Sequence, residues 1–145
     1  DSHHVVQIGC RCYNYPDYYS YIVEKGITEI SPRDFYRLGI EGSAKLALEK
    51  ATKGTDAIFI TIDIDVLEGI FAPGSGANET GGFNTYELQE VMKILAPYAQ
   101  SFNITEVNPA YDLKNEFSSI AAAKLMFDFI VHNYQPTERA LNILK

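Results

Sequence analysis

The sequence lacks the features of membrane-inserted and nucleic-acid-binding proteins. No apolar run approaches the ~20 residues of a transmembrane helix, and no signal-peptide pattern opens the chain. Basic residues are few, since 12 Lys and Arg stand against 19 Asp and Glu, for a formal net charge of −7. Because nucleic acids and anionic membranes attract clustered Lys and Arg, this charge argues against both as partners.

Cysteine is also scarce. Cys10 and Cys12 are the only two, and they lie two residues apart in an apolar, strand-like run. With no further cysteine, the pattern favours reduced thiols over a disulfide or a metal site. The composition is 46% hydrophobic, which is ordinary for a globular domain. We therefore expect a cytoplasmic protein with a normal apolar core.

Strand patterns alternate with helix patterns along the chain. At 145 residues there is room for one domain or part of one. Strands are expected at 5–9, 27–30, 57–62 and 101–107, and helices at 17–25, 32–38, 44–53, 86–95 and 119–130, with a last amphipathic turn at 137–145. This alternation predicts an α/β fold with a mainly parallel sheet and helices on both faces.

Carboxylates follow two of the expected strands. The run at 57–62 is typical of a strand buried on both faces, and Asp63 and Asp65 come at its end. Residues i and i+2 of a strand point to the same side, about 6.6 Å apart, so both side chains can reach one cation. Glu106 ends the next strand. Because parallel sheets place their sites at the carboxyl ends of strands, we expect the three carboxylates to share a crevice.

Glycines and capping residues mark the loops. Gly74, Gly76 and the pair at 81–82 indicate a backbone that turns sharply or approaches another segment closely. Ser43 and Thr85 are the predicted N-caps of two helices.

Five segments together resemble one family. They read VVQIGCR at 5–11, TIDID at 61–65, FAPG at 71–74, GG at 81–82 and EVNP at 106–109. The combination resembles the ureohydrolases, which include arginase, agmatinase and formimidoylglutamase, and the likeness extends over nearly the whole chain. It implies an arginase-like fold of three α/β/α layers.

The resemblance also implies a chemistry. Members of this family hold two Mn²⁺ ions in a crevice at the strand ends and hydrolyse a guanidino or formimino carbon. By the match of motifs, Asp63 would bridge the two metals and Asp65 would be a terminal ligand of one. Glu106 would be the catalytic and substrate-binding carboxylate, accepting hydrogen bonds from the cationic end of a small guanidino or formimino substrate. We also expect a homo-oligomer.

Three departures limit the resemblance. Glu68-Gly69 replaces an Asp-Pro of the family, and Ala77 lacks a hydroxyl that arginase carries near its substrate. The second difference favours an agmatinase-like substrate over that of arginase, with a formimidoylglutamase-type substrate as the alternative. The family's G-G-D-H-S and D-A-H-x-D motifs, which carry the other metal ligands, are absent, and the only histidines are His3, His4 and His132. We therefore expect residues 1–145 to be the C-terminal part of a single arginase-like domain, inactive by itself.

Two other functions stay open on the sequence. The Asp63-x-Asp65 pair also resembles the strand end of haloacid-dehalogenase phosphotransferases, although those proteins have no reason to carry APG or EVNP. A non-catalytic ureohydrolase-like module for binding or assembly is the other alternative. Arg11 follows a strand end and could border the crevice, but arginine is more often a surface or ion-paired residue.

Overall fold

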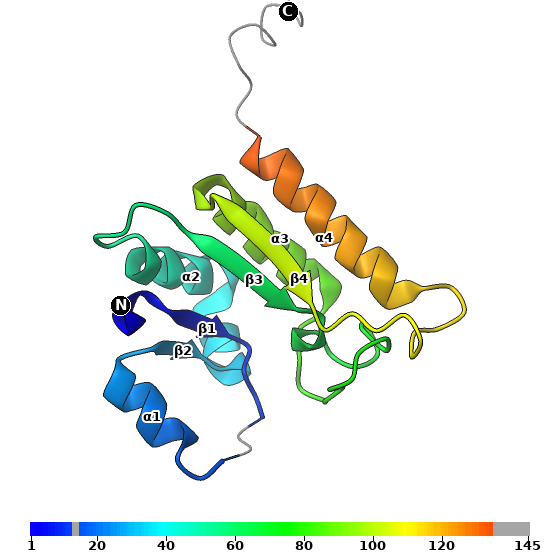
Figure 1. Ribbon diagram of the computed structural model, residues 1–145, viewed down its shortest axis with the longest axis horizontal. Coiled ribbons are helices and arrows are strands. Elements are labelled where there is room, and N and C mark those ends of the chain that lie inside the picture. The colour runs from blue at the N-terminus through cyan, green and yellow to red at the C-terminus, as the bar shows by residue number, and fades with distance from the viewer. Residues whose placement is uncertain (13–14, 135–145) are drawn as a thin grey trace, which may run out of the picture.

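The computed structural model describes residues 1–12 and 15–134, and it confirms the expected alternation of parallel strands and helices (Figure 1). The turn expected at 137–145 lies outside the described residues. No helix in the described part is long and apolar enough to cross a membrane. In chain order the elements, with η for a 3-10 helix, are η1 (Ser2–His4), β1 (Val6–Ile8), α1 (Tyr18–Lys25), β2 (Thr28–Ile30), α2 (Pro32–Ala51), β3 (Phe59–Asp63), η2 (Ile64–Val66), α3 (Thr85–Leu95), η3 (Ala96–Tyr98), β4 (Ser101–Thr105) and α4 (Phe117–Asn133).

The strands form two parallel pairs. β1 pairs with β2, with Ile8 opposite Ile30, and β3 pairs with β4, with Asp63 opposite Thr105. Within residues 1–12 and 15–134, no strand pairing joins β1 to β3. The predicted parallel pairing is confirmed, but the expected single sheet is divided at this point.

Local capping explains where two of the helices end or begin. α1 ends at Gly26, whose φ of 66° is the left-handed conformation predicted for a glycine at this position. α2 begins after Ser31, whose hydroxyl accepts a hydrogen bond from the amide of Asp34, with Pro32 in the first helical turn.

Two of the predicted caps are wrong. The expected interruption at Gly39 is confirmed, since its backbone is non-helical with φ 73° and ψ 172° and kinks α2 there. Ser43, however, lies buried inside the second part of α2 rather than at its start. Asn84 rather than Thr85 caps α3. Its side chain accepts from the amide of Glu87 while the Glu87 carboxylate accepts from the amide of Asn84, a reciprocal pair that uses two otherwise unbonded N–H groups.

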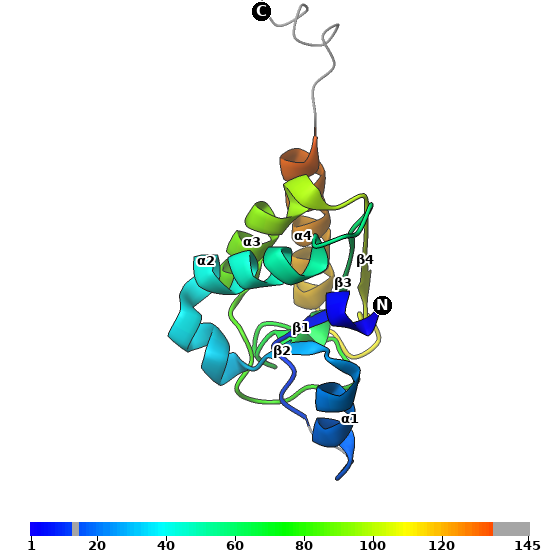
Figure 2. The same ribbon diagram turned by 90° about the vertical axis from the view of Figure 1, so that its left-hand side faces the viewer.

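Helices α2, α3 and α4 lie on one side of β3 and β4. α2 packs on α3 and α3 on α4, and all three lie behind these strands in Figure 1 and to their left in Figure 2. Ile62 of β3 is buried on this side, whereas Phe59 is 59% exposed on the other. The prediction that this strand is buried on both faces is therefore wrong for the described residues. The largest core side chains are Ile30, Phe35, Ile62, Ile64, Leu67, Phe83, Leu88, Met92 and Leu125.

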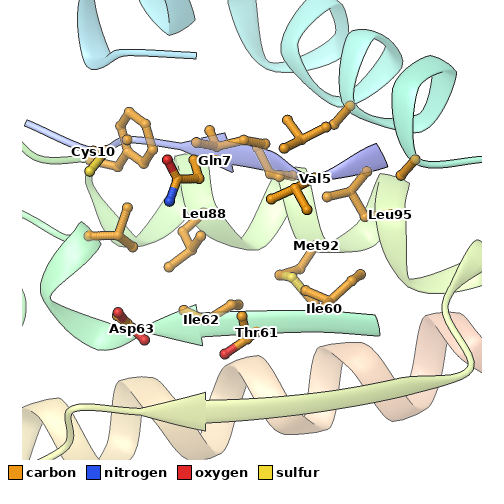
Figure 3. A pocket seen from close by; sticks show the side chains of 18 of the residues that line it. Val5, Gln7, Cys10, Ile60, Thr61, Ile62, Asp63, Leu88, Met92 and Leu95 are labelled. Atoms are coloured by element: carbon orange, nitrogen blue, oxygen red, sulfur yellow. The ribbon is translucent and has the colours of Figure 1, made fainter. Parts of the chain in front are cut away.

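A cavity of about 760 Å³ lies between β1 and β3 (Figure 3). Its walls are mainly apolar and include Val5 just before β1, Ile60 of β3 and Met92 of α3. Cys10 and Asp63 lie at the same end of it, because the two strands run in the same direction. The division of the sheet is thus an apolar opening that leads to the carboxyl ends of both strands.

One carboxylate organises the start of α4. Asp112 accepts hydrogen bonds from the amide and hydroxyl groups of Ser118 and Ser119 at 2.9 to 3.2 Å, and from the amide of Leu113 at 3.0 Å. Burial raises the pKa of Asp112, but these hydrogen bonds outweigh burial and lower the pKa to about 2. The ionised carboxyl therefore stabilises the fold above about pH 4, and this contribution is lost as the pH falls towards 2.

Replacing Asp112 with Asn should lower the free energy of unfolding by about 1–2 kcal/mol at pH 7, because the start of α4 loses a charged, multiple acceptor. The difference from wild type should shrink near pH 2, where the wild-type carboxyl is itself becoming protonated. Urea unfolding of the protein at its full natural length, at pH 7 and near pH 2, measures both effects. Asp56→Asn, at an exposed carboxylate before β3, is the matched control. A loss in D112N that does not depend on pH would contradict the role of the ionised group.

Candidate functional site

The first two candidate ligands come from the end of β3. The strand ends at Asp63, and η2 then turns the chain, so that Asp65 lies in the 3-10 helix and not two places along the strand. The expected i, i+2 strand geometry is therefore wrong. Both side chains nevertheless line the same cavity. The hydroxyl of Thr105, opposite Asp63 in the β4 register, donates a hydrogen bond to its carboxylate and fixes the orientation of that group.

The pKa of Asp65 is raised by its surroundings. Burial raises its pKa, and the charges of Asp63 and Glu106 raise it further, whereas Arg11 lowers it. Carboxylates on different elements raise one another's pKa only when they lie close enough to repel. Asp63 and Asp65 line the cavity, but Glu106 is not among its lining residues, so the crevice expected for three carboxylates is found for two of them. The charge of Glu106 still acts on Asp65 from the end of β4, and the negative charge around Asp65 would favour a bound cation.

Glu106 stands directly after β4 in a strained conformation. Its φ is 63°, in the left-handed region, which costs a non-glycine residue on the order of 1–3 kcal/mol. Just beyond it, the amide of Asn108 donates to the carbonyl of Gly74 at 2.8 Å, which ties the EVNP segment to the APG loop. Such strain persists where the surroundings fix the backbone, and it is concentrated at functional sites.

The glycine of the APG loop is required by a close approach. A Cβ on Gly74 would lie 2.7 Å from both Cβ and Cγ of Asp112, and the Gly74 amide donates to the hydroxyl of Ser118 at 2.7 Å. The same carboxylate that organises α4 therefore also supports this loop. Nothing lies within 4 Å of the corresponding position at Gly76, so only the first of these glycines is explained by packing.

Glu68 has a function that the sequence did not reveal. One of its carboxylate oxygens accepts hydrogen bonds from the amides of Gly81 and Gly82, at 2.5 and 2.8 Å. The Glu68 amide donates to the carbonyl of Phe83 at 2.8 Å, and a Cβ on Gly82 would lie 2.5 Å from the Glu68 nitrogen. Glu68, which stands where the family has the Asp of Asp-Pro, therefore holds the second half of the loop through the amides of Gly81 and Gly82. The signal available in the sequence was an acid followed by a Gly-Gly pair.

Arg11 takes the less favoured of the two positions that the sequence allowed. It lines the same cavity as Asp65, Ala77 and Glu79, and one of its terminal nitrogens donates to the backbone carbonyl of Asp65 at 2.7 Å. Its place directly after a strand end indicated that it could border the crevice, although a surface position or an ion pair was favoured. The backbone carbonyls that it contacts were not predicted.

The histidines lie away from this edge. His3 packs over Gly26, the Nδ1 of His4 lies 3.3 Å from the carbonyl of Lys50, and His132 is in the last turn of α4. The thiol of Cys10 lies 3.4 Å from the hydroxyl of Tyr18.

The donor set therefore fits a metal site only in part. Within residues 1–12 and 15–134, no group of three or more His, Cys, Asp or Glu side chains could hold a metal ion. Asp63 and Asp65 offer hard oxygen ligands that suit Mn²⁺, and their mutual repulsion with Glu106 is relieved by a cation. Asp63 and Asp65 could therefore supply some of the ligands of a metal site, but further ligands would be needed.

Replacing Gly74 with Ala should lower the free energy of unfolding by about 1–3 kcal/mol, because the added methyl group would overlap Asp112. Gly76→Ala is the matched control in the same loop, and its effect should stay within about 0.5 kcal/mol or be slightly stabilising. Urea unfolding of both variants at full natural length tests the difference. Equal effects at the two positions would contradict the close approach.

Comparison with known proteins identifies the family. The sequence model that describes the Arginase family matches residues 1–132 of this chain. Proclavaminate amidinohydrolase of Streptomyces clavuligerus is 32% identical over 130 residues, which cover 86% of this chain and 41% of that protein. The solved arginase from Bacillus caldovelox is 30% identical with a TM-score of 0.82, covering 94% of this chain and 45% of its own. For formimidoylglutamase from Bacillus subtilis the identity is 29% and the TM-score 0.86, covering 94% and 44%.

These matches confirm the predicted arginase-like α/β fold, here as part of a domain. The chain spans between about a quarter and two fifths of the length of the curated relatives it matches. The family match, together with the carboxylates at the ends of β3 and β4, leads to one conclusion. Residues 1–145 belong to the arginase family.

Proposed function

We propose that this chain is the C-terminal part of a binuclear manganese ureohydrolase, which hydrolyses a guanidino or formimino C–N bond. The observation that carries the proposal is the group formed by Asp63, Asp65 and Glu106 at the carboxyl ends of two paired strands. Membership of the arginase family supports amidine hydrolysis over the phosphotransferase alternative.

Each residue would have a separate role. Asp63 would hold both metal ions and Asp65 one of them, with Thr105 orienting the Asp63 carboxylate through its hydroxyl. When bound, a pair of Mn²⁺ ions lowers the pKa of water and so supplies a nucleophile at neutral pH.

Glu106 would act on the substrate. Its carboxylate accepts hydrogen bonds from the amidinium group, and the pairing of opposite charges holds the carbon to be attacked at the strand ends. The strained backbone at Glu106 supports this assignment, because strain of this kind is concentrated at functional sites. Water adds to the amidine carbon, and cleavage of the C–N bond gives an amine and a urea or an amide.

The remaining ligands would come from polypeptide outside residues 1–145. The share of the relatives that this chain covers supports this proposal, and so does the apolar cavity between the unpaired edges of β1 and β3. Segments bearing histidine and aspartate, placed next to Asp63 and Asp65, would complete the coordination of two ions. A homo-oligomer stays a prediction.

The substrate would be agmatinase-like rather than that of arginase. Ala77 lines the cavity near Asp63 and Asp65, and it has no hydroxyl with which to bind the polar end of an α-amino acid. A substrate of the formimidoylglutamase type is the alternative. Comparison of kcat/KM for agmatine, arginine and formimidoylglutamate on the protein of full natural length distinguishes the three.

Replacing Asp63 with Ala in the protein of full natural length should abolish binding of at least one Mn²⁺ per chain and lower kcat/KM by well over 100-fold. Groups that only support a metal ligand cost roughly 10–100-fold, so a larger loss is expected of a ligand itself. Metal analysis after dialysis and amidine hydrolysis measure the two effects. Asp56→Ala, at an exposed carboxylate seven residues earlier, is the control and should behave as wild type. Full metal content and activity in D63A would refute the assignment.

Residues 1–145 by themselves should release no urea, amine or formamide from these substrates, whatever Mn²⁺ concentration is supplied. The physical reason is that two carboxylates from this chain cannot hold two ions in place. A steady-state assay of the purified fragment, beside the protein of full natural length, tests this. Manganese-dependent turnover by the fragment would show that the missing ligands are not needed. A protein of full length with neither metal nor turnover would instead support a non-catalytic module.

A further inference from the structure

Arg11 directs its side chain at the backbone of two loops. Its Nη2 donates to the carbonyl oxygens of Asp65, Leu67 and Glu79 at 2.7, 3.2 and 3.0 Å. Its Nε donates to the carbonyl of Thr80 at 3.1 Å, and Nη1 contacts that of Val66 at 3.4 Å. One guanidinium therefore meets five backbone carbonyls, and none of the ion pairs among the described residues includes it.

These carbonyls need such a donor. Three of them belong to the end of η2, and the last carbonyls of a helical turn have no partner within the turn. Among the described residues, only the Val66 carbonyl has a second hydrogen-bond donor, the amide of Phe83 at 3.1 Å. A planar fork with five N–H groups can satisfy several acceptors at once, whereas the ammonium of lysine is a compact charge with three donors.

The two loops joined by Arg11 are the two sides of the site. The first is the turn that carries Asp65. The second, at 79–80, follows Ala77, and both Ala77 and Glu79 line the same cavity. Arg11 itself follows β1 across that cavity, so its contacts connect the carboxyl end of β1 to the turn after β3.

We propose that Arg11 is a positioning residue of this site: its guanidinium fixes the backbone of the Asp65 turn against the loop at 79–80, and so sets the geometry in which Asp65 binds metal. The proposal rests on the proposed function, because it assigns Arg11 a role in metal affinity.

Electrostatics and positioning predict opposite results for removal of Arg11. A positive charge beside the site repels a divalent cation, so its loss would tighten metal binding if charge were all that mattered. Loss of the backbone contacts frees the Asp65 turn, which weakens metal binding. The sign of the change therefore separates the two effects.

The experiment uses the protein of full natural length and measures Mn²⁺ affinity by competition with a chelator. Arg11→Met keeps the aliphatic stem without the charge, and Arg11→Lys keeps the charge without the fork. Both should weaken Mn²⁺ binding by about 10–100-fold, the range found for groups that orient a ligand. Arg37→Lys, whose side chain makes an exposed ion pair with Asp34, is the matched control and should leave the affinity unchanged.

Tighter or unchanged Mn²⁺ binding in R11M and R11K would overturn the proposal. A wild-type protein without Mn²⁺ and without turnover would overturn the proposed function instead, so the two failures are distinct.

A second measurement on the wild-type protein does not depend on the variants folding. If Arg11 couples the two loops, adding Mn²⁺ should slow amide hydrogen exchange at 79–82 as well as at 65–67. Protection confined to 65–67 would also overturn the proposal.

Discussion

The parallel pairing of β3 with β4 is the constraint on which the site depends. Its register sets Asp63 opposite Thr105, and Glu106 follows immediately. Because neighbouring parallel strands end at the same edge, residues more than 40 positions apart in the sequence meet there. A slip of one residue would turn every side chain of the strand to the other face and remove the Thr105 hydroxyl from Asp63. Hydrophobic contacts hold this register, since Ile62 belongs to the core and the half-buried Ile104 packs against it.

The negative charge of the carboxylates at this edge is only partly neutralised by Arg11. Burial and two neighbouring carboxylates raise the pKa of Asp65, and Arg11 offsets them only in part. Arg11 directs its donors to carbonyls rather than to carboxylates, so it leaves the acidic oxygens available. A cation is the physical complement of this arrangement. The apolar cavity between β1 and β3 opens at the same edge.

Much of the fold and part of the site could be predicted from local patterns. The strands, most helices and the positions of Asp63, Asp65 and Glu106 follow from periodicity and from the rule that sites lie at strand ends. The errors arose where tertiary contacts decide. Ser43 is a good capping residue in isolation, yet the helix extends past the kink at Gly39. The contacts of Glu68 and Arg11 were not predicted, because their partners are backbone groups, which local side-chain patterns do not specify.

The loops of the site are held by complementary backbone contacts. The Glu68 carboxylate binds amides at Gly81 and Gly82, while the Arg11 guanidinium binds carbonyls at Glu79 and Thr80. Within the described residues, Glu79 and Thr80 contact Arg11 through their backbone oxygens. Their side chains, like that of Ala77, can therefore change without loosening the backbone that carries them. An arrangement of this kind allows the residues beside the carboxylates to vary while the backbone around Asp65 stays fixed.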